Sequence, residues 1–366
     1  MKIVFLASRS GHTIKWINSL AKSNNEVHWI TQDVKHEKNN VVDNRVIIHQ
    51  LFFKSKVGYY LNLFELRRLL RQINPDIVNA HNASGYGTLI RLANFHPYVL
   101  NSWGSDVFNM KNAGYERMVI KNLKAADALA STSNGMANQI KKLLQDDSLK
   151  VYITPFGVDL ERYNYNKYLI EKKDDSIVIG VVKTLAPKYG IKMLIEAFAI
   201  VQNSLTSNEI SKKLVFKIYG DGPQRKELEK LSHNIGMEKK IHFMGRIPNN
   251  EVPEALSEMD IFCLGSECDS ESFGVAAVEA MAMKIPVIAT DVTGFKEVIV
   301  DNESGILIRR GDSELMAKTI IKLILDEEER KRLGENGRMR VEKEYDLALN
   351  LQTMIHMYDD VIRKDK

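Results

Sequence analysis

The chain has 366 residues, of which 44% are hydrophobic and 27% charged, a balance that is ordinary for a globular enzyme and argues against a disordered protein. This length exceeds what one hydrophobic core usually supports, so we expect two domains. No run of eighteen apolar residues occurs, which excludes a membrane-spanning helix, and two cysteines, Cys263 and Cys268, are too few for a disulfide framework and fit a reducing cytoplasm.

The net charge of +4 conceals an uneven distribution along the chain. Residues 1–165 hold 21 Lys and Arg against 13 Asp and Glu, so the remainder is net negative. The two parts are therefore expected to meet different partners. The basic residues are dispersed and form no recognisable nucleic-acid-binding module, so no nucleic acid partner is expected.

Short apolar runs alternate with helical periods along the first part of the chain, which is typical of successive βαβ units. The apolar start is too brief for a signal peptide and lacks a cleavage pattern, so we interpret it as a strand. The strands expected here are Lys2–Ala7, Glu26–Thr31, Val46–Phe53, Asp76–Ala80, Tyr98–Ser102, Ala128–Ser131 and Val151–Ile153.

A basic amphipathic helix is expected over Tyr59–Ile73, and Lys54 and Lys56 precede it. Its cations are Arg67, Arg68 and Arg71. Such a helix either lies on an anionic membrane surface or packs between domains with a solvated basic face.

Polar residues without periodicity, 164–175, are interpreted as a linker, after which the α/β pattern restarts. We expect a helix over Gly190–Leu205 and domains over 1–165 and 166–342, with a final helix over about 343–366 that packs back on the first domain. Two Rossmann-like domains facing a central cleft would place ligands at the carboxyl ends of their strands. The strands expected in this part are Ile177–Val182, Leu214–Tyr219, Lys240–Phe243, Ile261–Leu264, Pro286–Ala289 and Gly305–Ile308.

Polar and small residues follow several strands of the first domain. Gly11 follows the first strand and precedes a helix, so its backbone can approach a ligand closely. His12 either contacts a ligand, caps that helix or stacks on Trp16. His81 follows the fourth strand, and Asp106, which follows the fifth, either orients an acceptor hydroxyl, acts as a base or caps a helix.

Two lysines, Lys183 and Lys188, flank a turn after the first strand of the second domain. They either bind a diphosphate between them or are ordinary surface lysines. Gly220 opens a turn at the end of another strand. Glu271 and Glu279 stand on either side of a loop-to-helix transition and are expected on one face. Free N–H groups at the start of that helix suit phosphate oxygens, although two solvated surface acids have the same spacing.

Together these stretches resemble glycosyltransferase family 4, retaining enzymes of the GT-B fold that include bacterial surface-polysaccharide enzymes. The similarity covers nearly the whole chain. It is most specific from Glu271-Ser272-Phe273-Gly274 through Glu279-Ala280-Met281-Ala282 to Pro286-Val287-Ile288-Ala289, with Gly220-Asp221-Gly222-Pro223 and the Leu185-to-Gly190 loop. Thr184 and Tyr189 occupy the positions where the family has Arg and Lys, and Trp103 stands where many members have His.

The resemblance implies a role for each of these residues. Glu271 would contact the donor sugar, Glu279 the ribose, and Lys183 and Lys188 the leaving diphosphate. The remaining donor-binding residues would be Phe273, Gly274 and Val275 through their N–H groups, with Gly220 and Gly11. Asp106 would serve catalysis, and His12, His81 and Trp103 would contact the acceptor.

We therefore expect a retaining transferase that moves a hexose or N-acetylhexosamine from a nucleotide diphosphate donor, a UDP-sugar, to a hydroxyl of a lipid-linked glycan. No metal or other cofactor is expected, because lysines and helix N–H groups neutralise the diphosphate. The expected location is the cytoplasm, at the inner face of the cell membrane. Two alternatives remain: a nucleotide-sugar epimerase of the same architecture and a non-catalytic nucleotide-sugar-binding protein.

Overall fold

The computed structural model describes residues 1–33, 41–168, 176–206 and 210–365. Its contacts divide the chain into two units, the first formed by Met1–Phe156 together with the chain from Ala348 onward, and the second by Gly157–Leu347. The chain leaves the first unit earlier than the expected boundary at 165 and returns to it later than the expected one at 343. The described part of the predicted linker, residues 164–168, belongs to the second unit and contains the 3-10 helix η1 Tyr165–Tyr168. Residues 169–175 lie outside the described residues.

The first unit holds a seven-stranded parallel sheet in the order β3-β2-β1-β4-β5-β6-β7. Every strand predicted there is present, but β3 ends at Gln50, before the predicted Phe53. The strands are β1 Lys2–Leu6, β2 Glu26–Thr31, β3 Val46–Gln50, β4 Ile77–His81, β5 Tyr98–Ser102, β6 Ala128–Ser131 and β7 Val151–Ile153. The helices are α1 Gly11–Lys22, α2 Ser55–Leu61, α3 Leu63–Ile73, α4 Gly85–Ala93, α5 Ser105–Phe108, α6 Ala113–Ala125, α7 Asn134–Leu144 and α16 Leu347–Asp365.

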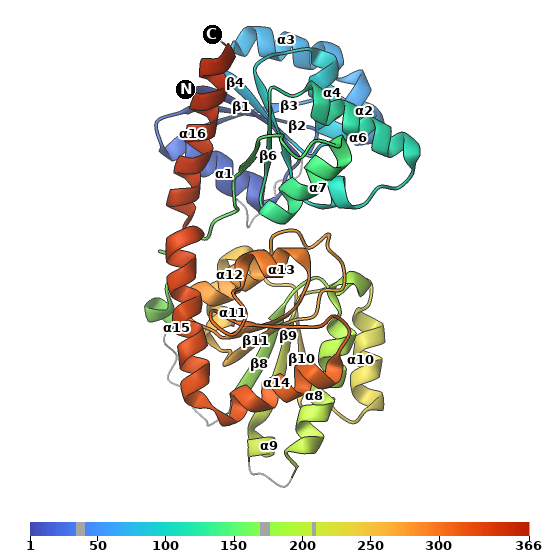
Figure 1. Ribbon diagram of the computed structural model, residues 1–366, viewed down its shortest axis with the longest axis vertical. Coiled ribbons are helices and arrows are strands. Elements are labelled where there is room, and N and C mark those ends of the chain that lie inside the picture. The colour runs from blue at the N-terminus through green and yellow to red at the C-terminus, as the bar shows by residue number, and fades with distance from the viewer. Residues whose placement is uncertain (34–40, 169–175, 207–209, 366) are drawn as a thin grey trace. The chain divides into compact units, whose positions relative to one another are not determined.

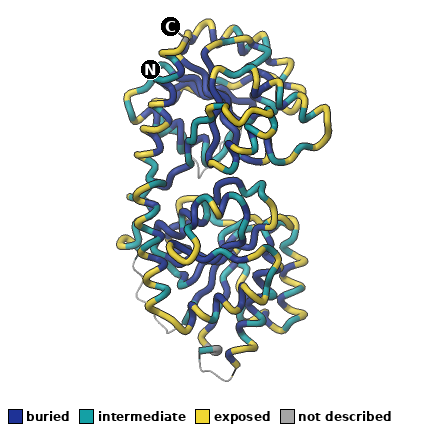
Figure 2. The backbone as a smooth tube through the Cα atoms, viewed as in Figure 1, coloured by how far each residue is buried: buried dark blue, intermediate teal, exposed yellow. Residues whose placement is uncertain are grey.

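Helices cover both faces of this sheet, so its inner strands are buried almost throughout, whereas the edge strand β3 is largely exposed and the other edge strand, β7, is half-buried (Figures 1 and 2). Successive strand residues point to opposite faces. Val78 and Ala80 of β4 join the core with α3, α4, α6 and α7. Asn79 lies between them in sequence, and its side-chain nitrogen is 2.5 Å from the hydroxyl oxygen of Tyr358 on α16. The C-terminal helix is therefore part of the first unit.

The basic helix predicted over Tyr59–Ile73 is two helices, because α2 ends at Leu61 and α3 begins at Leu63. Asn62 lies between them and its side chain bonds both backbone groups of Phe53, at 2.9 Å from the nitrogen and 2.7 Å from the oxygen. The side chain of Asn62 thus ties the junction of the two helices to the loop that precedes α2. The amphipathic pattern of Tyr59–Ile73 predicted the apolar face of the helix but not the interruption at Asn62.

The second unit holds a six-stranded sheet in the order β10-β9-β8-β11-β12-β13, and its registered pairs are parallel. Its strands match the predicted ones to within a few residues: β8 Ile177–Val182, β9 Leu214–Tyr219, β10 Ile241–Gly245, β11 Ile261–Leu264, β12 Val287–Thr290 and β13 Ile306–Ile308. The helices are α8 Ile191–Ser204, α9 Ile210–Lys213, α10 Arg225–Asn234, α11 Val252–Ser257, α12 Val275–Ala282, α13 Thr293–Val298, α14 Ser313–Leu325 and α15 Glu327–Glu344. The short 3-10 helices η2 Pro187–Tyr189 and η3 Asn249–Glu251 complete it.

Candidate functional site

An ion pair joins two of the predicted site residues in the second unit. The ammonium nitrogen of Lys183 lies 2.6 Å from Oε2 of Glu271, and the two side chains are only 15% and 12% exposed. Lys183 follows β8, and Glu271 lies in the loop after β11, the strand that pairs with β8. Adjacent strands thus bring together two residues that are far apart in the sequence, at the edge where an α/β sheet binds ligands.

The loop that carries the two lysines is held on both sides by backbone contacts. A Cβ atom at Gly220, whose φ is +139°, would overlap the carbonyl oxygen of Lys183, and one at Gly190, whose φ is +60°, would overlap that of Gly265. Only glycine fits such contacts without strain. The structure thus gives Gly220 a packing role beside Lys183, and its predicted contact with the donor stays a prediction.

The aromatic ring of Tyr189 lies beside both lysines. The ammonium nitrogens of Lys183 and Lys188 are each 4.7 Å from the ring centre, a distance at which a cation is attracted to an aromatic face. Lys188 is exposed, whereas Lys183 is largely shielded. Each lysine stands one residue before the position where the family has its cation, and both lie beside the ring of Tyr189.

The helix after Glu271 begins at Val275, with Gly274 as its N-cap in the left-handed region at φ +87°. Within the described residues no side chain caps this helix, so N–H groups of its first turn are left for other acceptors. Phe273 is buried, and its ring lies 5.5 Å from that of Tyr345. Glu271 precedes the helix, so the expectation that Glu271 and Glu279 share one helix face is wrong: the left-handed Gly274 separates them.

Glu279 lies on α12 and faces Tyr163, a buried residue near the start of the second unit. Burial raises the pKa of the Tyr163 hydroxyl, and the neighbouring charge of Glu279 and the hydrogen bond between the two side chains raise it further. The hydroxyl therefore stays protonated and holds the Glu279 carboxylate in place. Tyr163 was not among the predicted site residues, since nothing local to it marks this contact.

Arg310 fixes the loop that leads to Glu271, and sequence reasoning missed it. Its guanidinium donates to Asp269 at 2.7 and 3.2 Å and to the carbonyl oxygen of Asp291 at 3.2 Å. Asp269 also accepts hydrogen bonds from the backbone nitrogen and the hydroxyl of Thr293. Burial opposes ionisation of Asp269, but these donors outweigh it and hold its pKa below the usual value.

A second contact holds the same loop from the other side. The N–H of Gly294 donates to the carbonyl oxygen of Glu271 at 2.9 Å. A Cβ atom at Gly294 would overlap this oxygen, so the pair Thr293-Gly294 needs its glycine. The loops after β11, β12 and β13 therefore act together to place the backbone of Glu271.

In the first unit, aromatic side chains gather at the carboxyl ends of the strands. His12 stacks on Phe156, with 4.0 Å between ring centres, and lies 6.1 Å from Trp103. His81 lies 4.4 Å from both Phe5 and Trp103. The N-cap of α1 is Ser10, whose side chain accepts from the nitrogen of Thr13. Ser10 therefore caps this helix in place of His12, and His12 stacks on Phe156 in place of Trp16, while its predicted contact with a ligand stays a prediction.

His81 is almost completely buried, and within the described residues neither ring nitrogen has a hydrogen-bond partner. Burial lowers the pKa of its imidazole to about 3, so the ring is neutral near pH 7. The structure brings it against Trp103 as a packing neighbour. Its predicted contact with an acceptor stays a prediction, and Trp103 and His12 are the more accessible members of this cluster.

Asp106 lies in α5 and is buried, and its carboxylate accepts hydrogen bonds from the backbone nitrogens of Ala83, Trp103 and Gly104 at 2.8 to 3.2 Å. Burial raises its pKa, and these donors oppose the rise. The side chain therefore ties the loops after β4 and β5 together. This arrangement supports a positioning role for Asp106, and its predicted role as a base stays a prediction.

Gly11 is the first residue of α1 and has no positive φ. Just before it, the backbone nitrogen of Arg9 donates to Asp33, and Ser10 caps the helix. The loop after β1 is therefore ordered by its own hydrogen bonds. The expected approach of a donor to Gly11 stays a prediction.

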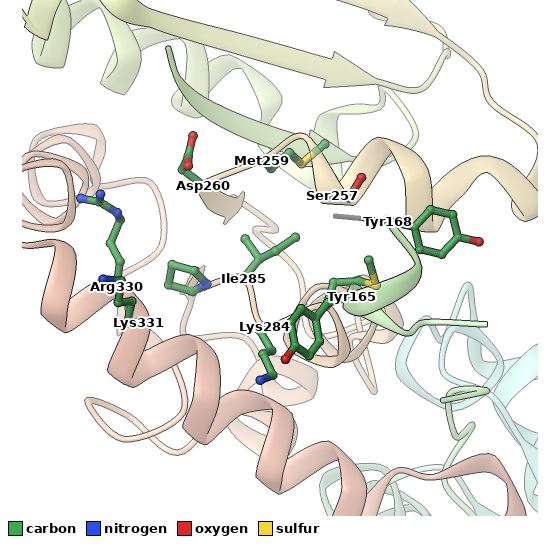
Figure 3. A pocket seen from close by; sticks show the side chains of 11 residues that line it. Tyr165, Tyr168, Ser257, Met259, Asp260, Lys284, Ile285, Arg330 and Lys331 are labelled. Carbon is green, nitrogen blue, oxygen red and sulfur yellow. The ribbon is translucent and has the colours of Figure 1, made fainter. Parts of the chain in front are cut away.

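A pocket in the second unit, shown in Figure 3, lies away from these residues. Its lining includes Asp260 and Pro286, which precede β11 and β12, so it opens at the amino ends of these strands. Lys284 in this pocket lies 2.8 Å from Glu335 and over the ring of Tyr165. The positive charge of Lys284 is thus paired with Glu335, and the pocket is separate from the Lys183–Glu271 pair.

The described residues contain no group of three or more metal-ligating side chains, and none of their helices is long and apolar enough to cross a bilayer.

Comparison with known proteins identifies both units. Residues 167–340 match the family model of glycosyl transferases group 1, and residues 2–133 match that of glycosyl transferase 4-like proteins. The capsular polysaccharide biosynthesis glycosyltransferase CapM of Staphylococcus aureus is 26% identical, with 96% of this chain and 94% of that protein covered. The N-acetyl-alpha-D-glucosaminyl L-malate synthase of Bacillus anthracis is also 26% identical, with 95% and 92% covered.

Solved structures agree on the fold. HepE of Anabaena, crystallised in complex with UDP, has a TM-score of 0.82 at 17% identity, and the match covers 98% of this chain and 100% of HepE. A glycosyltransferase of Rickettsia africae has a TM-score of 0.82 at 18% identity, with 99% and 98% covered. These two neighbours and the two family models confirm two Rossmann-like units of the GT-B type, and the chain belongs to the family 4 glycosyltransferases.

Proposed function

We propose that this glycosyltransferase is a retaining enzyme that moves a hexose or N-acetylhexosamine from a UDP-sugar to a hydroxyl of a glycan acceptor. The observation that carries the proposal is the shielded Lys183–Glu271 pair beside the uncapped start of α12. A carboxylate that binds sugar hydroxyls and a cation that binds phosphate are adjacent there. The UDP in the HepE structure supports the nucleotide, and the name of CapM supports a polysaccharide product.

The donor is bound by charge and by backbone groups. An ammonium group has three donors, so Lys183 can keep its contact with Glu271 while it donates to a phosphate oxygen. Lys188 and the first turn of α12 add further positive charge. Glu279, held by Tyr163, accepts from the ribose hydroxyls.

In the transfer, the bond between the sugar C1 and the diphosphate oxygen breaks while the acceptor oxygen forms its bond to C1. The acceptor proton passes to the departing phosphate oxygen, on the same face of the sugar. Negative charge grows on the diphosphate, where Lys183, Lys188 and the helix N–H groups stabilise it. Glu271 is held by Lys183 and serves to bind the sugar, so no covalent intermediate is needed.

Neutralisation by these cations makes the reaction independent of a metal ion. A chelator such as EDTA should therefore leave the rate of the purified enzyme unchanged. A loss of activity that is restored by added Mg²⁺ or Mn²⁺ would refute this part of the proposal.

The acceptor is a lipid-linked glycan at the inner face of the cell membrane. The excess of basic residues in the first unit supports this, since anionic lipids attract such a surface. His12 and Trp103 of the aromatic cluster are the rings against which a sugar of the acceptor would stack.

The test has two steps. A panel of nucleotide sugars is screened by thermal shift, because a ligand that binds the folded state raises its melting temperature. The stabilising donor is then incubated with glycan acceptors, and the anomeric configuration of the product is read by NMR. We expect a UDP-sugar to bind and the product to keep the donor configuration; free epimerised donor, or binding without transfer to any acceptor, would support the two alternatives.

A further inference from the structure

We propose that the segment from Phe52 to Phe64 is a membrane-docking surface that inserts apolar side chains into an anionic lipid bilayer. The proposal deepens the membrane part of the proposed function. It rests on a concentration of exposed apolar residues: nine of the fourteen exposed large hydrophobic side chains among the described residues lie between Val41 and Phe64. We call six of them the apolar cap: Phe52, Phe53, Val57, Tyr60, Leu61 and Phe64.

The exposure of the cap is extreme for aromatic residues. Phe64 is 80% exposed and Phe52 is 78% exposed. Single exposed hydrophobic residues are common on proteins, but a contiguous group of this kind marks an interaction surface. The group follows β3, the edge strand of the first sheet, and continues over α2 and the start of α3.

Hydrogen bonds and close packing fix the backbone of the segment that carries the cap, so the exposed side chains of the cap have fixed positions. Asn62 bonds both backbone groups of Phe53, and Glu65 accepts from the nitrogen of Phe52 at 3.0 Å. Gly58 packs so closely that a Cβ there would approach the carbonyl oxygen of Phe53. Tyr59 points inward and packs edge-on against Tyr86, with 5.1 Å between ring centres.

Exposed basic residues lie within and just after the segment that forms the cap. Lys54 and Lys56 lie within the segment, and Arg68 and Arg71 are exposed on α3. In the described part of the chain, none of these four side chains forms an ion pair with an acidic residue. Arg68 and Phe64 are four residues apart on one helix, so cation and apolar group share a face.

This combination favours a lipid surface over other occupants. Aromatic and aliphatic side chains enter the boundary between headgroups and acyl chains, while Lys and Arg bind anionic headgroups. A second copy of the chain placed symmetrically on the same surface would bring Lys54 and Lys56 against their own equivalents. The charges therefore oppose self-association and favour an anionic bilayer.

Flotation of the full chain with vesicles tests the proposal. Vesicles of phosphatidylcholine and phosphatidylglycerol in equal amounts are compared with phosphatidylcholine alone, at low salt and without donor or acceptor. We expect binding to the anionic vesicles, weakened by at least about tenfold in Phe52→Ser/Phe64→Ser, which removes two inserted rings. Lys54→Glu/Lys56→Glu should lose roughly fivefold or more for each lysine replaced.

Leu325→Ser/Met339→Ser is the matched control, since it removes two exposed apolar side chains of the second unit, and it should bind as the wild type does. Absence of binding by the wild type, or equal binding by all variants, would overturn the proposal. Sedimentation that shows a wild-type dimer and a monomeric Phe52→Ser/Phe64→Ser variant would overturn it in favour of a second copy.

The same variants separate docking from catalysis. Phe52→Ser/Phe64→Ser should keep the donor-induced thermal shift and its transfer rate to a water-soluble acceptor, because the cap contains none of the donor-binding residues. If no nucleotide sugar binds the wild type, the proposed function fails while the flotation result stands. If donors bind but the vesicles do not, the docking surface alone fails.

Discussion

Replacement of Lys183 by methionine should separate its role as a counterion from its role toward the diphosphate. In the wild type its ammonium nitrogen lies 2.6 Å from Glu271, and both side chains are largely shielded. Lys183→Met keeps much of the side-chain length but leaves the Glu271 carboxylate without this cation. Lys183→Met/Glu271→Gln removes both charges and allows a thermodynamic cycle with the single variant Glu271→Gln.

The expected magnitudes differ for stability and for rate. Breaking a buried pair on one side costs about 3 kcal/mol or more of unfolding free energy, because the remaining charge is poorly solvated. The double variant should recover most of that loss. The transition-state contact with the diphosphate is worth about 3 kcal/mol, so kcat/KM should fall roughly a hundredfold or more in Lys183→Met and remain low in the double variant.

The assay combines urea unfolding with initial rates of nucleotide release at several donor concentrations. Lys217 of β9, in the same sheet as β8, provides a matched control, because its ammonium nitrogen lies 2.6 Å from Glu258 at the end of α11, with side chains 24% and 33% exposed. Lys217→Met should lose stability and keep kcat/KM. Recovery of both stability and rate in Lys183→Met/Glu271→Gln would refute the reasoning, since Lys183 would then act only as the counterion of Glu271.

Three further predictions follow from single residues. Arg310→Gln, which frees the loop before Glu271, should raise the donor KM roughly tenfold, whereas exposed Arg309→Gln should leave it unchanged; equal KM values would contradict the positioning role. Glu279→Gln should weaken UDP binding by calorimetry about tenfold, and unchanged affinity would remove Glu279 from the ribose site. The folded-state pKa of His81, about 3, lies below its ordinary value of 6.5, so the unfolded chain binds the extra proton and stability should fall by about 1.4 kcal/mol per pH unit below pH 6.5. His81→Phe should show a smaller loss between pH 7 and pH 5 in urea titrations, and an identical pH dependence would contradict this assignment.

The strands and the helix predicted over Gly190–Leu205 could be read from the sequence because their signals are local. Runs of Val and Ile such as Ile177–Val182 predict buried parallel strands, and β8 has those bounds in the structure. Gly274 likewise predicts a break in the backbone, and the structure places it in the left-handed region before α12. The residues Lys183, Glu271 and Glu279 were chosen from the same local patterns and from family resemblance.

The tertiary structure decided which of these residues meet. Lys183 pairs with Glu271 because β8 lies next to β11. The order of strands in a sheet cannot be predicted from the local periodicity of the sequence. Arg310 and Tyr163 join the site for the same reason: each is distant in sequence from the residue that it holds. Asn62 separates α2 from α3 where the pattern predicts one continuous helix, and its side chain bonds Phe53, a residue outside both helices. Local chemistry determined the elements of this protein, and the topology that places distant loops at one sheet edge determined its candidate site.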